Sequence, residues 1–229
     1  ALGVPLLCAL VYVVWIPHGN GGRSAWFATK IWVLGYPLFF FGLIGLGGLT
    51  RREDRPATWP SWKVVILTGF LIGVGIALVG WLMVITPVGD IVKASSPNLV
   101  EKVKGLGFAT TGRFLMVATF ITLLHSAMEE YYWRWFVYGR ARQYLGPRAA
   151  SFFSSLAFMA HHVVVLNTFF PGDFWSATVP LSLCIAMGGV IWSVVYERTG
   201  SLYGAWLSHA LVDVSIMICG WDMAFGGGS

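Results

Sequence analysis

Long apolar stretches, most of them about twenty residues in length, follow one another along the whole sequence. They cover roughly residues 1–17, 26–49, 63–86, 111–138, 149–170, 175–196 and 201–220. A helix of about 20 apolar residues crosses the hydrocarbon core of a bilayer. Only 11% of the residues are charged, whereas a soluble domain carries about 25%. We therefore expect an all-α, polytopic transmembrane helical bundle of about seven to eight spans, with residues 1–229 forming a single integral membrane domain.

The first apolar stretch and the last four residues differ from the other segments. The first stretch has no basic residues before its apolar run and no clear cleavage site, so a span is favoured over a signal peptide. The last four residues, Gly226–Ser229, have the composition of a linker remnant, and we expect them to take no part in the fold.

The distribution of Lys and Arg predicts the orientation of the chain in the membrane. The net charge of +5 is dispersed along the chain, which argues against a nucleic-acid partner. Eight basic residues lie at the connections 51–63 and 140–148 and at Arg198, against four at Arg23 and in 93–104. Because cytoplasmic loops of membrane proteins carry the excess of Lys and Arg, we expect the 140–148 connection on the cytoplasmic side.

Charged and histidine side chains inside the apolar stretches gather in three of them. The groups are His125, Glu129, Glu130 and Arg134, then His161 and His162, then His209 and Asp213. Ionisable groups inside a membrane are costly and are normally kept for a function. At about 1.5 Å per residue, Glu129, His162 and His209 lie roughly 17–21 Å from the nearest basic residue on the same side. Three helices therefore present titratable groups at one depth.

Helical spacing divides the two adjacent glutamates. Residues four apart share a helix face, which pairs His125 with Glu129, Glu130 with Arg134 and His209 with Asp213. Adjacent residues point about 100° apart. We therefore expect Glu130 to form a structural ion pair with Arg134, while Glu129 faces a polar cavity as a general base. By the same geometry, only one of His161 and His162 should reach the site.

Three motifs together resemble one known family. Glu129-Glu130-x-x-x-Arg134, Phe158-x-x-x-His162 and His209-x-x-x-Asp213 resemble the CPBP family of intramembrane proteases. That family includes the CAAX prenyl endopeptidases and bacteriocin-processing or self-immunity proteins. The resemblance covers the core of the chain, about residues 111–220. Asp213 stands where prenyl-processing eukaryotic members tend to have Asn, as is common in prokaryotic relatives.

The resemblance implies a glutamate-dependent peptidase without a metal or other cofactor. Glu129 and His162 would activate a water molecule, and His209 with Asp213 would help to bind the oxyanion. The supporting residues would be Glu130, Arg134 and His161, with the motif spacing favouring His162 over His161 as the catalytic histidine. The expected partners are the lipid bilayer and a protein or peptide substrate with a C-terminal or membrane-proximal cleavage site. The expected location is a prokaryotic cytoplasmic membrane.

The same residues are compatible with two other functions. An intramembrane zinc metalloprotease could use several His and carboxylate ligands, although no HExxH pair occurs and the best-placed histidines lie on different predicted helices. A non-enzymatic immunity or transport protein could use buried Glu, His and Asp as a proton relay, although no inverted repeat is visible.

Overall fold

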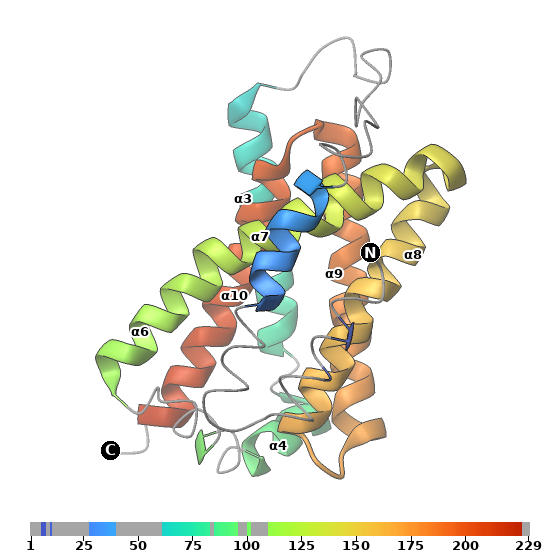
Figure 1. The fold of residues 1–229 in the computed structure, drawn as a ribbon. Coiled ribbons are helices and arrows are strands. Elements are labelled where there is room, and N and C mark those ends of the chain that lie inside the picture. The colour runs from blue at the N-terminus through green and yellow to red at the C-terminus, as the bar shows by residue number, and fades with distance from the viewer. Residues whose placement is uncertain are drawn as a thin grey trace.

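The computed structural model describes residues 6–7, 10, 28–39, 61–82, 85–95, 100–101 and 110–225. All regular secondary structure within these ranges is helical (Figure 1). A helix satisfies its own backbone hydrogen bonds, which a chain in lipid requires. The all-α prediction is therefore confirmed for the described residues. Gly226–Ser229 and most of the first apolar stretch lie outside them.

Among the described residues, four helical stretches are long and apolar enough to cross a membrane: Trp62–Leu82, Thr111–Phe169, Phe174–Thr199 and Leu202–Phe225. The elements that compose the described chain from residue 62 onward are α3 (Trp62–Leu82), α4 (Pro87–Ala94), α6 (Thr111–Thr119), η4 (Phe120–His125), α7 (Ser126–Glu130), η5 (Tyr131–Tyr138), α8 (Gly139–Phe169), η6 (Phe174–Thr178), α9 (Val179–Thr199) and α10 (Leu202–Phe225). A further helix covers residues 28–39. The total of seven to eight spans stays a prediction.

The longest of these stretches is divided by a glycine. Thr111–Phe169 contains 59 residues, and a straight helix of that length would measure about 90 Å. Gly146 has φ 74° and ψ 167°, outside the helical region, and Pro147 follows it. Only glycine adopts such a backbone readily, and the chain reverses direction beyond this point (Figure 1). The stretch therefore forms a first arm before Gly146 and a second arm after it, which correspond to the predicted apolar segments 111–138 and 149–170.

Helix α10 contacts α3, α9 and α7, and small residues bring it close to α3. A Cβ atom on Gly69 would overlap the carbonyl oxygen of Gly204, and one on Gly73 would lie 2.9 Å from the Cα of Ser208. Small residues allow such close backbone approach between helices in a membrane. Because Ser208 directly precedes His209, this packing also fixes the position of His209.

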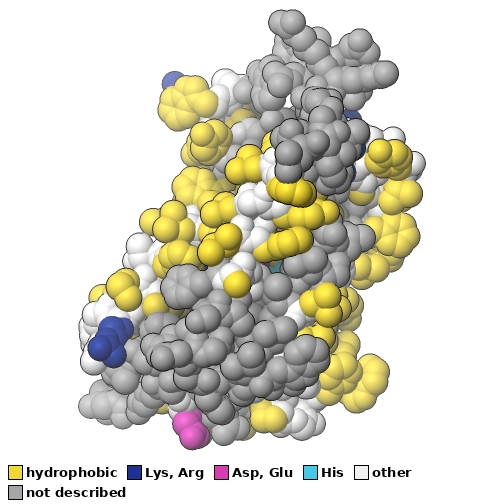
Figure 2. Space-filling view, in the orientation of Figure 1, with side chains coloured by type: hydrophobic (Ala, Val, Ile, Leu, Met, Phe, Trp, Pro, Cys, Tyr) yellow, Lys and Arg dark blue, Asp and Glu magenta, His cyan; other side chains and the backbone are white. Residues whose placement is uncertain are grey.

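Apolar side chains cover much of the outside. Trp62 is 71% exposed and Leu71 is 60% exposed, both on α3. Figure 2 shows hydrophobic side chains along the described part of one face, with few charged ones among them. Lipid tails are as apolar as leucine, so this surface is suited to a bilayer.

A half-buried charged cluster joins the first arm to the end of α9. The guanidinium of Arg142 donates to Oε1 of Glu197 from Nη2 at 2.7 Å and from Nε at 2.9 Å. The hydroxyl of Tyr138 donates to Oε2 of Glu197 at 2.7 Å. The cluster brings the 140–148 connection and Arg198 to the same end of the molecule, which the predicted orientation requires. The orientation itself stays a prediction.

The close approach of α3 and α10 can be tested with one methyl group. Gly69→Ala should lower stability by about 1–3 kcal/mol, because the added Cβ forces the two backbones apart. Gly75→Ala is the matched control, since a Cβ at Gly75 of the same helix meets nothing within 4 Å. Melting temperatures of the detergent-purified variants measure the effect. Equal melting temperatures for the two variants would contradict this packing.

Candidate active site

The carboxylate of Glu129 lies among imidazoles from three parts of the chain. Its Oε1 is 3.6 Å from Nε2 of His125 and 3.5 Å from Nε2 of His161, and its Oε2 is 3.7 Å from Nε2 of His209. Glu129 is 8% exposed. The groups that the sequence places at one depth therefore meet in space, on the first arm, α8 and α10.

The segment that carries the two glutamates is a short α-helical turn, α7, between the π-helical stretches η4 and η5. Such π-helical turns occur frequently at functional sites. Within α7 the two carboxylates diverge. Glu130 Oε2 is 3.2 Å from Nε of Arg134, and both side chains are 1% exposed. The ion pair that the spacing predicts is present.

Aromatic rings enclose the guanidinium of Arg134. Its Cζ lies 4.7 Å from the ring centroid of Phe158 and 5.2 Å from that of Trp192. A cation over an aromatic face gains electrostatic attraction, especially when it is shielded from water. Phe158, the first residue of its motif, thus packs against Arg134, the last residue of the Glu129-Glu130-x-x-x-Arg134 motif.

Glu130 also holds a histidine, which spacing within one helix could not indicate. Nδ1 of His209 donates to Oε1 of Glu130 at 2.9 Å, since a carboxylate oxygen can only accept. The indole of Trp192 stacks on the His209 ring, with centroids 4.1 Å apart and planes at 14°. Oδ1 of Asp213 lies 3.8 Å from Nε2 of His209. His209 is therefore oriented on three sides.

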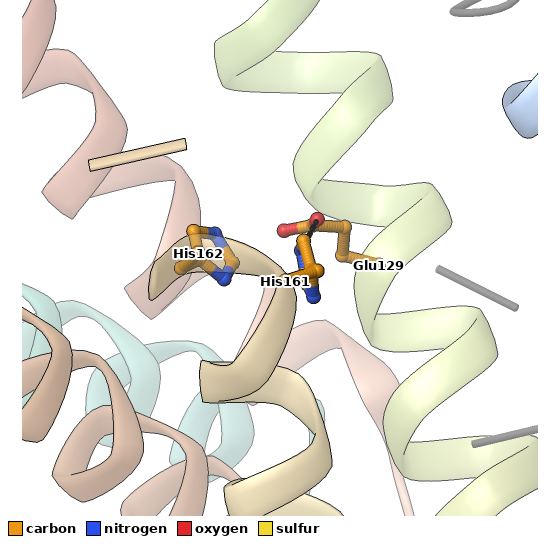
Figure 3. A group of neighbouring side chains, drawn as sticks. All are labelled: Glu129, His161 and His162. Atoms are coloured by element: carbon orange, nitrogen blue, oxygen red, sulfur yellow. Dashed lines mark ion pairs between the residues drawn. The ribbon is translucent and has the colours of Figure 1, made fainter. Parts of the chain in front are cut away.

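Both His161 and His162 lie near Glu129, but among the described residues only His161 of the two contacts its carboxylate, with Nε2 3.5 Å from Oε1. One ligand atom from each of the three residues lies within 4.8 Å of the others, and Figure 3 shows both rings beside the carboxylate. Their ring centroids are only 4.0 Å apart, with planes at 42°. We expected the best-placed histidines to lie on different helices, which argued against a metal site. His161 and His162 both lie on α8, so that expectation is wrong for this group.

The partners of these histidines indicate which nitrogen carries a proton. Nδ1 of His162 donates to the carbonyl oxygen of Phe158 at 2.9 Å, which leaves its Nε2 with a lone pair. Nδ1 of His125 accepts from Nζ of Lys30 at 2.9 Å, because an ammonium group can only donate. Nε2 of His125 then carries the proton and faces Glu129. The site thus offers both proton acceptors and proton donors.

Lys30 and His125 were missed as site residues. Lys30 lies on the helix 28–39, far from the motifs in sequence, and that helix also accepts a hydrogen bond at the carbonyl of Leu34 from the Tyr131 hydroxyl (3.4 Å). A lysine within an apolar stretch was the one available signal for Lys30. For His125, the spacing of four residues from Glu129 was the signal.

The ion pair can be tested by removing its cation. Arg134→Met leaves Glu130 buried without its counter-charge, which costs about 3–5 kcal/mol, or a fall in melting temperature of roughly 6–20 °C. Arg148→Met, at an exposed arginine, is the control. The double change Glu130→Leu with Arg134→Met should recover part of the stability but no activity, because His209 loses its acceptor. A double variant no more stable than Arg134→Met would contradict the pairing.

Comparison with known protein families gives a match that covers the same residues. The family model described as type II CAAX prenyl endopeptidase Rce1-like matches residues 111–215. This range includes all three motifs and every site residue named above except Lys30. No curated protein and no solved structure matches the chain. The match over residues 111–215 supports the resemblance of this part of the chain to the CPBP family of membrane proteases, which includes the type II CAAX prenyl endopeptidases.

Proposed function

We propose that this protease hydrolyses a peptide bond near the cytoplasmic side of the membrane with a water molecule activated by Glu129 and His162. One observation carries the proposal: a buried carboxylate with imidazoles around it, contributed by separate helices. Peptide hydrolysis requires a proton acceptor for the attacking water and stabilisation of the oxyanion that forms. The site offers side chains for both tasks.

The acceptor side consists of Glu129 and His162. The carboxylate of Glu129 accepts hydrogen bonds from a water molecule, and the Nε2 lone pair of His162 is directed by the bond from Nδ1 to Phe158. Positioned acid–base groups contribute about 10²–10⁴-fold to a rate. The proton that leaves the water can then be passed to the amine of the leaving peptide.

The donor side consists of His209, supported by Asp213. The His209 ring is fixed by its bond to Glu130 and by the stacked indole of Trp192. When Nε2 carries a proton, it donates toward the carbonyl oxygen on which negative charge develops, and a donor held in place before the reaction is most effective. Asp213, 3.8 Å from that nitrogen, supports the ring orientation.

The substrate in this proposal is a protein or peptide whose cleavage site lies at its C-terminus or close to the membrane. A segment at the cytoplasmic face would enter the site between the helices. The family match supports a CAAX-type C-terminus as the first substrate to test. Matched farnesylated and unmodified peptides would separate recognition of the peptide from recognition of the prenyl group.

Glu129→Gln should lower cleavage of such a peptide by about 10²–10⁴-fold, because the amide cannot take a proton from water. His162→Gln should have a similar effect. Asp222→Asn is the control, since it neutralises an exposed carboxylate on α10. Cleavage is followed with an internally quenched peptide and purified protein. Size-exclusion profiles check that each variant stays folded.

Wild-type activity in Glu129→Gln would overturn this mechanism. Loss of wild-type activity on treatment with a chelator, and its return with zinc, would favour a metalloprotease instead. The natural substrate can then be sought by comparing protein termini in membrane and secreted fractions of cells that carry wild-type protein or Glu129→Ala.

A further inference from the structure

The proposed reaction assigns no role to His161. Nε2 of His161 lies 3.5 Å from Oε1 of Glu129, and the residue is 8% exposed. Among the described residues, its Nδ1 has no hydrogen-bond partner. The ring lies parallel to the indole of Trp133, with planes at 2° and centroids 5.8 Å apart. His161 is therefore a second oriented histidine beside the Glu129 carboxylate.

The donor atoms of Glu129 and His161 have the spacing of a transition-metal site, and a donor atom of His162 lies within 4.8 Å of both. A tetrahedral zinc ion with bonds of about 2.0–2.1 Å holds its ligand atoms about 3.3 Å from one another. The distance between His161 Nε2 and Glu129 Oε1 is 3.5 Å, and all three ligand atoms lie within 4.8 Å of each other. Two imidazoles and one carboxylate are also the protein ligands of known hydrolytic zinc sites.

The surroundings of His162 match those of a metal ligand. A histidine that binds a metal almost always donates its other ring N–H to a carbonyl or carboxylate, which fixes the ring and directs the lone pair. The bond from His162 Nδ1 to the carbonyl of Phe158 is of this kind. It is independent of the distances among the three donors.

We propose that Glu129, His161 and His162 form an inhibitory binding site for Zn²⁺. The ion takes the carboxylate oxygen and the lone pair of His162 that the proposed reaction needs for water, so metal binding and hydrolysis exclude each other. Once Glu129 is a ligand, it cannot serve as the base. Glu130 is held by Arg134 and His209, so it is not available to replace Glu129. The inhibition rests on the proposed function, whereas the binding does not.

Binding is tested with the metals alone on the purified full chain. Co²⁺, which substitutes for zinc and has visible d–d absorption, should give a saturable spectrum that Zn²⁺ abolishes. His161→Gln should weaken Co²⁺ binding by about 100-fold or more, because loss of even an outer-shell partner of a metal ligand costs about 10–100-fold. His161→Phe is the second variant, since it retains a ring against Trp133. The matched control is His125→Gln, which removes another imidazole near Oε1 of Glu129 whose Nδ1 is occupied by Lys30.

Inhibition is tested in the cleavage assay. Zn²⁺ should inhibit wild-type protein at the concentrations at which it displaces Co²⁺, and relief by a chelator should restore activity. Absence of a saturable Co²⁺ spectrum, or an equal loss of binding in His125→Gln and in a folded His161 variant, would overturn the site. Activity that requires Zn²⁺ would overturn its inhibitory role. If Glu129→Gln retains activity, the proposed function fails while the Co²⁺ titration of wild-type protein still decides whether the site exists.

Discussion

The buried ion pair between Glu130 and Arg134 is the interaction on which the arrangement of the site depends. Both side chains are 1% exposed, and burial of two charges carries a large desolvation cost. The rings of Phe158 and Trp192 cover the guanidinium, and the second oxygen of Glu130 accepts from His209. One pair thus connects the first arm with α8, α9 and α10. The Glu130–Arg134 pair fixes these four elements relative to one another. A buried ion pair contributes little to stability by itself.

Glu129 differs from its neighbour because, in the described part of the chain, no Lys or Arg forms an ion pair with it. Its contacts are with imidazoles, which can gain or lose a proton, whereas Glu130 faces a guanidinium that stays charged. Two identical side chains, adjacent in sequence, therefore have different chemistry because the helix directs them into different surroundings. This difference supports the assignment of the reaction to Glu129 and of the scaffold to Glu130.

Contacts within one helix could be predicted from the sequence, and contacts between helices could not. The pairs Glu130 with Arg134 and His209 with Asp213 follow from a spacing of four residues. The stacking of Trp192 on His209 depends on how α9 approaches α10, which no local pattern records. Likewise, no local pattern in the sequence predicted the π-helical stretches η4 and η5 on either side of α7. For the same reason, the sequence could not indicate that both His161 and His162 would lie near Glu129.

In the proposed reaction, Glu129 activates water and does not attack the peptide itself. A single turnover in H₂¹⁸O, with enzyme in excess over a cleavable peptide, tests it directly. If water attacks, every product carries one ¹⁸O in its new carboxylate, and the peptide fragment that contains Glu129 carries none. If the carboxylate attacks to form an anhydride, ¹⁸O can enter Glu129 while unlabelled oxygen enters the product. Label in Glu129 after one turnover would contradict the account.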